Sequence, residues 1–113
     1  YAGIEALLGP QNSIEKMIVE FQKRKDFMVC ELNKIDNIDC INPGGAFYVF
    51  PKITKENYSS HEIANDLLEK KYLATVPGSS FGTQGEGFLR ISYASNIENL
   101  TQAISLIKNF MNE

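Results

Sequence analysis

Hydrophobic and polar positions follow a helical spacing in three stretches of the chain. Between residues 14 and 35 apolar side chains recur on one face, with a polar gap near Arg24. Residues 63–72 and 97–111 repeat the pattern, and the last stretch has the strictest spacing of three and four residues. The sequence therefore predicts one long and two shorter amphipathic helices.

Each predicted helix is preceded by residues that suit its first turn. In a capping box, a Ser, Thr, Asn or Asp and a Glu three residues later each satisfy a backbone N–H that the helix start leaves free. Three pairs have this spacing: Asn12 with Glu15, Ser59 with Glu62, and Ser95 with Glu98. We expect the three helices to begin at these pairs.

The segments between the helices carry β-strand patterns. Residues 38–41 and 73–76 are short β-prone pieces, and Ala46–Phe50 is a continuous apolar run that predicts an interior strand covered on both faces. Phe88–Ala94 alternates in the way a strand does. Pro77–Gly87, rich in glycine, is expected to be a mobile connector.

The order of these elements predicts the fold class. Helix, strand, strand, helix, strand, strand, helix indicates an α+β fold, with a small mixed or antiparallel sheet of three to four strands and helices packed largely on one face. The length of 113 residues favours one domain. Residues 1–8 look like the tail of a preceding helix, so residues 9–113 are interpreted as one domain of a longer protein; the alternative is a complete small protein.

Composition narrows the functions that this domain can have. The chain is 43% hydrophobic and 22% charged, which excludes disorder, and its net charge of -3 argues against nucleic acid as the main partner. No apolar run approaches the ~18–20 residues of a membrane span. Cys30 and Cys40 form no CxxC pair, and the single His61 cannot complete a zinc set. We expect no metal, and free thiols in a reducing, cytoplasmic compartment.

Arg90 is the most informative polar residue. It lies in the middle of the predicted strand Phe88–Ala94, on the face opposite Leu89, Ile91 and Tyr93. A guanidinium is always charged, and its paired donors match a carboxylate. Arg90 is therefore a candidate for binding an acid group, although an arginine in that position is also compatible with a structural ion pair or a solvated sheet face.

The remaining residues define no complete active site by themselves. Ser79 and Ser80 lack the GxSxG context of an activated nucleophile, and Pro77–Gly87 lacks the signature of a phosphate-binding loop. Tyr48 and Tyr93 are read most simply as strand packing. No lysine lies in an evident apolar pocket, so no catalytic residue is assigned. From these residues alone, a stand-alone amino-acid-binding module or an interaction domain without catalysis remains open.

Several motifs taken together resemble a known family. Gly9–Gln11 leads the long helix, Pro43–Phe50 follows a short strand, and Val76–Gly82 precedes Gly85–Ala94 before the closing helix. Their order and spacing resemble the C-terminal small domain of class I/II aminotransferases, the pyridoxal-phosphate enzymes of fold type I, and most of all the bacterial-type aspartate aminotransferases. The resemblance covers essentially the whole chain.

The resemblance implies a function and its partners. The arginine that matches Arg90 binds the α-carboxylate of the substrate, and Phe47 and Phe81 are weaker candidates for the wall of the substrate site. Pyridoxal 5'-phosphate belongs to the full-length enzyme, a homodimer whose large domain carries the catalytic lysine, and none is expected on this chain. The expected activity is transfer of an amino group between amino acids and 2-oxo acids, with this chain inactive alone.

Overall fold

The computed structural model describes all residues, 1–113, and contains four α-helices and five short strands. The helices are α1 (Ala2–Leu8), α2 (Asn12–Leu32), α3 (Ser60–Lys71) and α4 (Ile97–Met111). The strands are β1 (Ile38–Asp39), β2 (Tyr48–Val49), β3 (Lys52–Ile53), β4 (Val76–Pro77) and β5 (Leu89–Ser92). Two 3-10 turns, η1 (Gly78–Phe81) and η2 (Thr83–Gly85), lie between β4 and β5.

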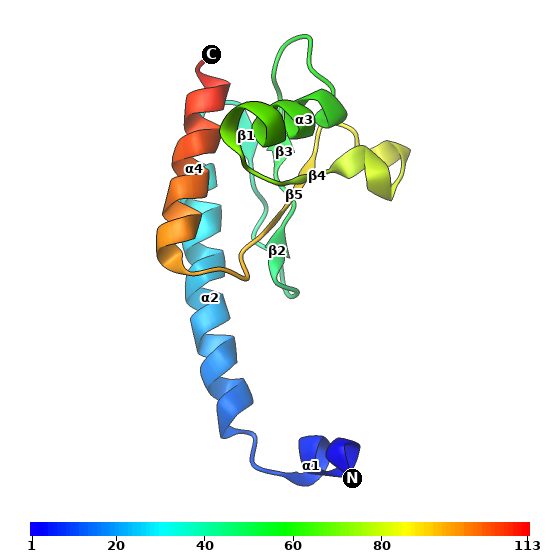
Figure 1. Cartoon of the computed structure of the whole chain (residues 1–113), viewed down its shortest axis with the longest axis vertical. Helices are drawn as coiled ribbons and strands as arrows, with labels where there is room; N and C mark the ends of the chain where they lie inside the picture. The colour runs from blue at the N-terminus through cyan, green and yellow to red at the C-terminus, as the bar shows by residue number, and fades with distance from the viewer.

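Strand β5 is the centre of the main sheet. It pairs antiparallel with β2 on one side and with β4 on the other, and β1 and β3 form a second antiparallel pair. An isolated bridge between Lys52 and Phe88 joins β3 to the start of β5. The predicted α+β class with a small antiparallel sheet is confirmed. Figure 1 shows α4 and the second half of α2 side by side next to the strands, with α1 far from them.

The alternation along β5 divides the molecule into a core side and an open side. Leu89, Ile91 and Tyr93 are buried, whereas Arg90 is half-buried and Ser92 is exposed. The buried side chains belong to one hydrophobic cluster with side chains of α2, α3 and α4. The helices therefore cover the Leu89 side of the sheet, and Arg90 is turned away from the core, as the sequence pattern predicted.

The segment Ala46–Phe50 differs from its prediction. It was expected to be an interior strand covered on both faces, but β2 is an edge strand of two residues. Val49 is fully buried, while Phe47 and Tyr48 are 57% and 38% exposed. The continuous apolar run therefore does not reflect burial on both faces. Its inward residue packs in the core, and its neighbours line the surface.

One of the three expected capping boxes is present. Ser59 accepts a hydrogen bond from the backbone N–H of Glu62, whose carboxylate in turn accepts one from Ser59 N–H. The other two expectations are wrong by one position. Helix α2 has Gln11 at its N-cap without a side-chain bond, and α4 uses Asn96, which accepts from the backbone N–H of Asn99. Ser59 and Asn96, the two N-cap residues that accept a side-chain bond, have extended backbone angles, and spacing alone did not identify Asn96.

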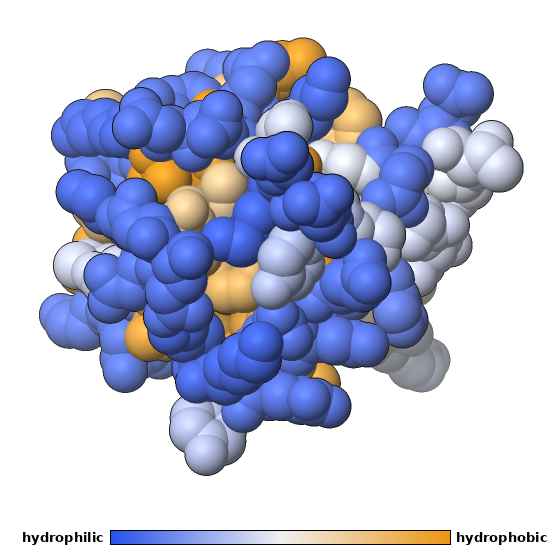
Figure 2. Space-filling view, turned by 90° about the horizontal axis from the view of Figure 1, so that it is seen from above, coloured by the Kyte–Doolittle hydropathy of each residue, from blue (hydrophilic) through white to orange (hydrophobic).

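The start of the chain extends away from the rest of the molecule. Helix α1 and the first half of α2 project from the other elements as an N-terminal arm, residues 1–20, in which every residue but Gly9 is exposed (Figure 1). The opposite end of the molecule is mostly hydrophilic, with hydrophobic side chains visible only in small gaps (Figure 2). No helix in the chain combines the length and apolar character that crossing a membrane requires.

Both cysteines are free thiols, Cys30 exposed and Cys40 buried. Burial, with a smaller contribution from the charge of Asp39, raises the pKa of the Cys40 thiol to about 11. Cys40 is therefore protonated at neutral pH and acts as a core residue rather than as a nucleophile.

Candidate carboxylate-binding site

Arg90 is the only positively charged residue of the central strand β5, and it lies on the open face of the sheet. It lies directly opposite Val76 of β4, and its neighbour Ile91 pairs with Val49 of β2. Because β5 is held on both sides by backbone hydrogen bonds, the base of the Arg90 side chain is fixed in position. The strand thus supplies a rigid mount for the guanidinium.

Aromatic rings surround the guanidinium. The Arg90 Cζ atom lies 5.5 Å from the centre of the Tyr48 ring and 5.1 Å from that of Phe81. Phe81 meets Phe50 edge to face at 6.0 Å, and Phe50 stacks on Phe88 at 5.3 Å. We call these four rings, Tyr48, Phe50, Phe81 and Phe88, the aromatic wall. It gives Arg90 a partly desolvated setting in which its charge is less screened than in open water.

Arg90 has no acidic partner within the chain. None of the five ion pairs includes it, and its side chain donates no hydrogen bond to any other residue. The interpretation of Arg90 as a structural ion pair is therefore wrong. The rings of the aromatic wall contact the cation without accepting its N–H donors in conventional hydrogen bonds, so the paired donors remain available to an external carboxylate.

The second arginine of the chain provides a contrast. Arg24 on α2 also lies over an aromatic ring, with its Cζ atom 5.5 Å from the centre of Phe21. Its Nε atom, however, donates to the Glu20 carboxylate at 3.0 Å. Arg24 is thus neutralised by a helix neighbour one turn away, whereas Arg90 keeps its charge and its donors free.

The glycine-rich segment after β4 is folded tightly against this site. Gly78 and Gly85 are buried with their backbones in contact, and a β-carbon at either position would overlap the other's carbonyl. Glu86 accepts hydrogen bonds from the backbone N–H of Ser60 at 2.7 Å and from its hydroxyl at 3.0 Å. These contacts tie the segment to α3, so it is an anchored turn rather than the mobile connector expected from its composition.

The hydrogen bonds also set the charge of the Glu86 carboxylate. The bond from Ser60 N–H is the largest cause, and it holds the pKa of Glu86 below its usual range against the opposing effect of desolvation. The bond from the Ser60 hydroxyl lowers the pKa further. The group is consequently ionised at neutral pH. It sits at the first turn of α3, where the helix dipole also favours a negative charge.

Phe81 and Phe47 occupy different places. Phe81 is part of the aromatic wall and contacts Arg90. The Phe47 ring meets Tyr48 edge to face at 6.0 Å, so it is one ring removed from the guanidinium. It lines a groove of about 320 Å³ between α2 and the turn that precedes β2, together with apolar side chains of α2 such as Met17 and Ile18.

The two tyrosines of the strands also separate. The Tyr93 hydroxyl donates to the carbonyl of Ala46 at 2.7 Å, and burial raises the pKa of this buried phenol. Tyr93 therefore fastens the turn before β2 and belongs to the core. Tyr48 instead is exposed on the open face beside Arg90. The expectation that both tyrosines pack within the sheet is confirmed for Tyr93. It is wrong for Tyr48, whose ring lies on the open face beside Arg90.

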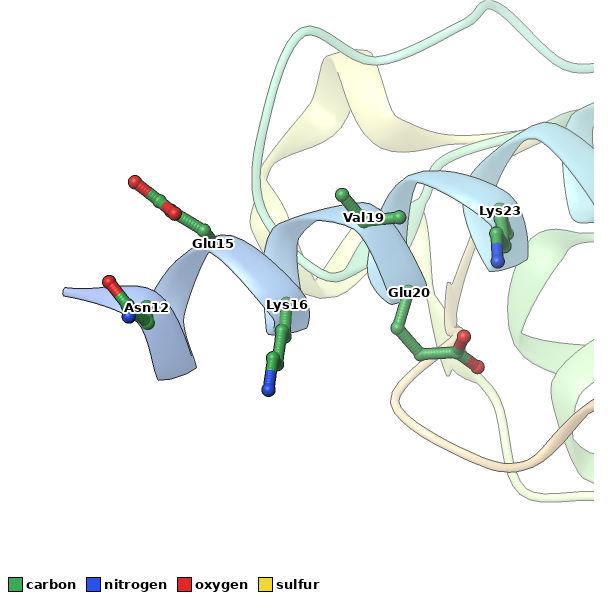
Figure 3. A pocket seen from close by; sticks show the side chains of 6 residues that line it. All are labelled: Asn12, Glu15, Lys16, Val19, Glu20 and Lys23. Carbon is green, nitrogen blue, oxygen red and sulfur yellow. The ribbon is translucent and has the colours of Figure 1, made fainter.

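A larger hollow lies elsewhere and forms no comparable site. Its volume is about 460 Å³, and it is lined by six residues that all come from α2: Asn12, Glu15, Lys16, Val19, Glu20 and Lys23. In Figure 3 these side chains diverge, with Glu15 and Val19 on one side of the ribbon and Lys16 and Glu20 on the other. Acidic and basic groups are mixed, and no second element contributes to the lining.

The residues around Arg90 fit a carboxylate and do not form a complete cofactor site. The lysine that lies over aromatic rings, Lys55, contacts Tyr58 and Phe110 rather than a ring of the aromatic wall. The lysines with polar partners are engaged elsewhere, for example Lys55 with the Phe110 carbonyl at 3.0 Å and Lys70 with Asp66 at 2.8 Å. The site thus consists of one cation and the aromatic rings beside it.

Comparison with known proteins places this α+β chain in a family. The chain matches the family model "Aminotransferase class I and II" over residues 1–107. The chain is therefore a member of the class I and II aminotransferase family, which confirms the resemblance inferred from its motifs.

Individual relatives agree on the family and differ in their named substrates. The aspartate aminotransferase of Pyrococcus horikoshii is 40% identical over 109 residues, which cover 95% of this chain and 28% of that protein. Aromatic-amino-acid aminotransferase 2 of Thermococcus litoralis is 34% identical over 115 residues, covering 100% of this chain and 29% of that protein. The chain thus spans less than a third of these relatives.

A solved structure agrees with the fold. The alanine aminotransferase from Pyrococcus furiosus superposes with a TM-score of 0.94 at 33% identity, over 98% of this chain and 28% of that one. The same small fold therefore occurs in proteins named for aspartate, for aromatic amino acids and for alanine. Similarity over these 113 residues is thus shared by proteins named for three different substrates.

Sequence reasoning found Arg90 and missed part of its surroundings. Phe88 precedes Arg90 by two residues, and Phe50 follows Tyr48 by two, so strand periodicity places each pair on one face. That signal was present in the sequence. The meeting of Phe50 with Phe81, by contrast, depends on how the 3-10 turns return to the sheet.

Proposed function

We propose that the chain is the C-terminal small domain of a pyridoxal-phosphate-dependent aminotransferase, in which Arg90 binds the α-carboxylate of the substrate. The observation that carries this proposal is the half-buried guanidinium of Arg90, which lies between two aromatic rings and has no acidic partner. Such a group costs energy to keep partly desolvated and unpaired, and a bound carboxylate would offset that cost.

The remainder of the active site is proposed to lie on a large domain outside these residues. Pyridoxal phosphate bound there would supply an electron sink for the α-carbon of the amino acid. The role of this chain is to orient the substrate: Arg90 holds one end, while the aromatic wall excludes water from the ion pair. Residues 1–8 would continue a helix that links the domains, and residues 9–113 would form the small domain of a homodimer.

The proposed reaction transfers an amino group from aspartate or a related amino acid to 2-oxoglutarate. The names of the relatives support an amino-acid donor, and aspartate is the one that the sequence resemblance favours. Phe81 would form the wall next to Arg90. Phe47 would line the side of the site toward α2, in the groove that it shares with Met17 and Ile18 of the arm.

Substitution of Arg90 in the full-length enzyme tests this function. Arg90→Leu should raise the KM for both the amino acid and the 2-oxo acid, because each substrate carries an α-carboxylate. Loss of one partner of a buried, hydrogen-bonded charge pair costs about 2–5 kcal/mol, which corresponds to a rise of roughly 30-fold or more. Steady-state kinetics with L-aspartate and 2-oxoglutarate measure the effect, and unchanged KM values would reject the role.

Arg24→Leu is the matched control. It removes the other arginine that lies over an aromatic ring, but one whose charge is already paired with Glu20. Since exposed helix ion pairs contribute little, KM should stay within about twofold of the wild-type value. Equal effects of both substitutions would show that Arg90 acts through general charge or stability rather than through the substrate.

The isolated chain separates this proposal from the alternative of a stand-alone amino-acid-binding module. We expect no amino-group transfer and no binding heat with L-aspartate or L-alanine in calorimetry, because Arg90 and the aromatic wall supply only one side of the site. Saturable heat with the 113-residue chain would favour the binding module.

A further inference from the structure

Glu86 joins two segments that are distant in the sequence. Its carboxylate accepts bonds from the backbone N–H and the hydroxyl of Ser60, the first residue of α3. The same Ser60 hydroxyl lies 3.2 Å from the hydroxyl of Ser79 in η1. Ser60 is only 1% exposed, whereas Ser79 and Glu86 are exposed, so the three side chains meet at the surface beside the first turn of α3. We call Glu86, Ser60 and Ser79 the loop latch.

A second carboxylate at the same helix start shows what is special about the loop latch. Glu62 also has its pKa lowered, first by the bond from Ser59 N–H. Its partner, however, is the N-cap residue of its own helix. Glu62 therefore stabilises α3 alone, whereas Glu86 connects α3 to the segment between β4 and β5. Both carboxylates accept hydrogen bonds at the start of α3, but only that of Glu86 comes from another segment of the chain.

The loop latch lies close in the chain to the ring that touches Arg90. Ser79 and Phe81 belong to the same 3-10 turn, and Gly78 at its start is packed against Gly85. Phe81 then reaches Phe50 and the guanidinium of Arg90. A contact that fixes Ser79 therefore fixes the turn whose last residue closes one side of the Arg90 environment.

We propose that Glu86 is a positioning residue for carboxylate binding: by latching η1 to the start of α3, it holds the Phe81 ring against Arg90. This inference rests on the proposed function, because the ligand is taken to be the α-carboxylate of the substrate. Glu86 itself touches neither the ligand nor the guanidinium. It acts on binding by keeping water away from Arg90 and by limiting the positions that the side chain can take.

Paired substitutions in the full-length enzyme test the proposal. Glu86→Ala should raise the KM for L-aspartate and 2-oxoglutarate about tenfold, with kcat within about threefold of wild type, since small displacements of a positioning group weaken binding by such factors. Glu62→Ala, the matched control, should lower thermal stability without changing KM. Equal changes in KM for the two variants would overturn the proposal, because both would then reflect a weakened α3.

The direction of the change in KM distinguishes positioning by Glu86 from a simple effect of its negative charge. Removing a negative group near a cationic site should lower the KM for an anionic substrate, whereas loss of the loop latch should raise it. Glu86→Gln, which keeps an acceptor for Ser60 N–H, should recover part of the wild-type KM. A KM below the wild-type value in either Glu86 variant would contradict positioning.

A second measurement is independent of catalysis. Amide hydrogen exchange of residues 78–85 should become faster in Glu86→Ala and stay unchanged in Glu62→Ala. If the wild-type enzyme transferred no amino group, the proposed function would fail, yet exchange would still decide whether the loop latch exists. If Glu86→Ala did not fold, Ser79→Ala, which removes only the hydroxyl contact, should show the same changes at smaller size. Unchanged amide exchange of residues 78–85 in whichever of these two variants folds would show that the loop latch does not hold the segment.

Discussion

The N-terminal arm and the rest of the chain use the same kind of apolar pattern with opposite results. In residues 21–113, seventeen buried hydrophobic residues form one cluster. In residues 1–20, Leu7 and Leu8 are each 82% exposed, and Met17 and Ile18 are 57% and 61% exposed. The radius of gyration of 16.1 Å exceeds the roughly 13 Å expected for a compact domain of this length, because the arm projects from it.

The comparison shows that an amphipathic pattern identifies a helix without identifying its partner. One continuous helix, α2, changes from a covered to an uncovered apolar face between Phe21 and Ile18. Contiguous exposed apolar side chains are typical of an interaction surface. In the proposed enzyme, the large domain would cover this arm, and the stability of the isolated chain would come from residues 21–113 alone.

The largest expected effect contrasts a leucine in the core with one in the arm. Leu89 is fully buried on β5, so Leu89→Ala should reduce the free energy of unfolding by about 3 kcal/mol through lost burial and a cavity. Leu8→Ala should change it by less than about 0.5 kcal/mol. Urea unfolding followed by circular dichroism of the 113-residue chain measures both. A comparable loss in the two variants would show that the arm packs on the chain in solution.

A smaller effect is expected at the helix starts. Ser59→Ala removes the bond to Glu62 N–H and should cost about 1 kcal/mol, the usual value of an N-cap. Asn12→Ala, at the first residue of α2 in the arm, should change stability by less than about 0.5 kcal/mol because its side chain caps nothing. The same urea titrations apply. An equal loss of unfolding free energy in Asn12→Ala and Ser59→Ala would show that Asn12 does cap α2, as its spacing from Glu15 suggested.

The smallest expected difference concerns acid. The lowered pKa values of Glu62 and Glu86 mean that each carboxylate stabilises the folded chain when ionised. This contribution is complete above about pH 5 and is lost as pH falls through the folded-state pKa values. Glu62→Gln should therefore flatten the fall of stability below that pH. In Glu5→Gln, which leaves the Glu62 and Glu86 carboxylates and their hydrogen bonds in place, urea unfolding at a series of pH values should still show the fall.

The elements of the fold could be predicted from the sequence because hydrophobic periodicity reports the type of element, although not always which of its apolar residues are buried. The alternation in β5 placed its buried side chains correctly. The spacing in α4 identified Leu100, Ile104 and Ile107, but Ile97 at the helix start is exposed, and the buried Phe110 was not among the expected positions. The cap of α4 was missed by one residue because it depends on the backbone angles of Asn96, which spacing does not encode. The edge position of β2 was missed because pairing order depends on the whole chain.

The candidate site divides in the same way. Arg90 could be found because its own strand sets its direction. Its lack of a partner could not, since fourteen acidic residues in the chain could in principle have reached it. The contact between Phe81 and Arg90 depends on two 3-10 turns and on the anchoring of Glu86 to α3, which are tertiary features. Only the resemblance pointed to Phe81 in advance.

Alternate residues of the central strand β5 face the core and the open side of the sheet. This alternation limits where residues can be inserted or deleted. An insertion of one residue between Gly87 and Leu89 would rotate every following side chain of β5 to the opposite side. Ile91 would then enter water and Arg90 would enter the hydrocarbon interior. Natural or engineered variants can therefore exchange residues along this segment, but we expect deletions and insertions there to abolish folding and ligand recognition in a single event.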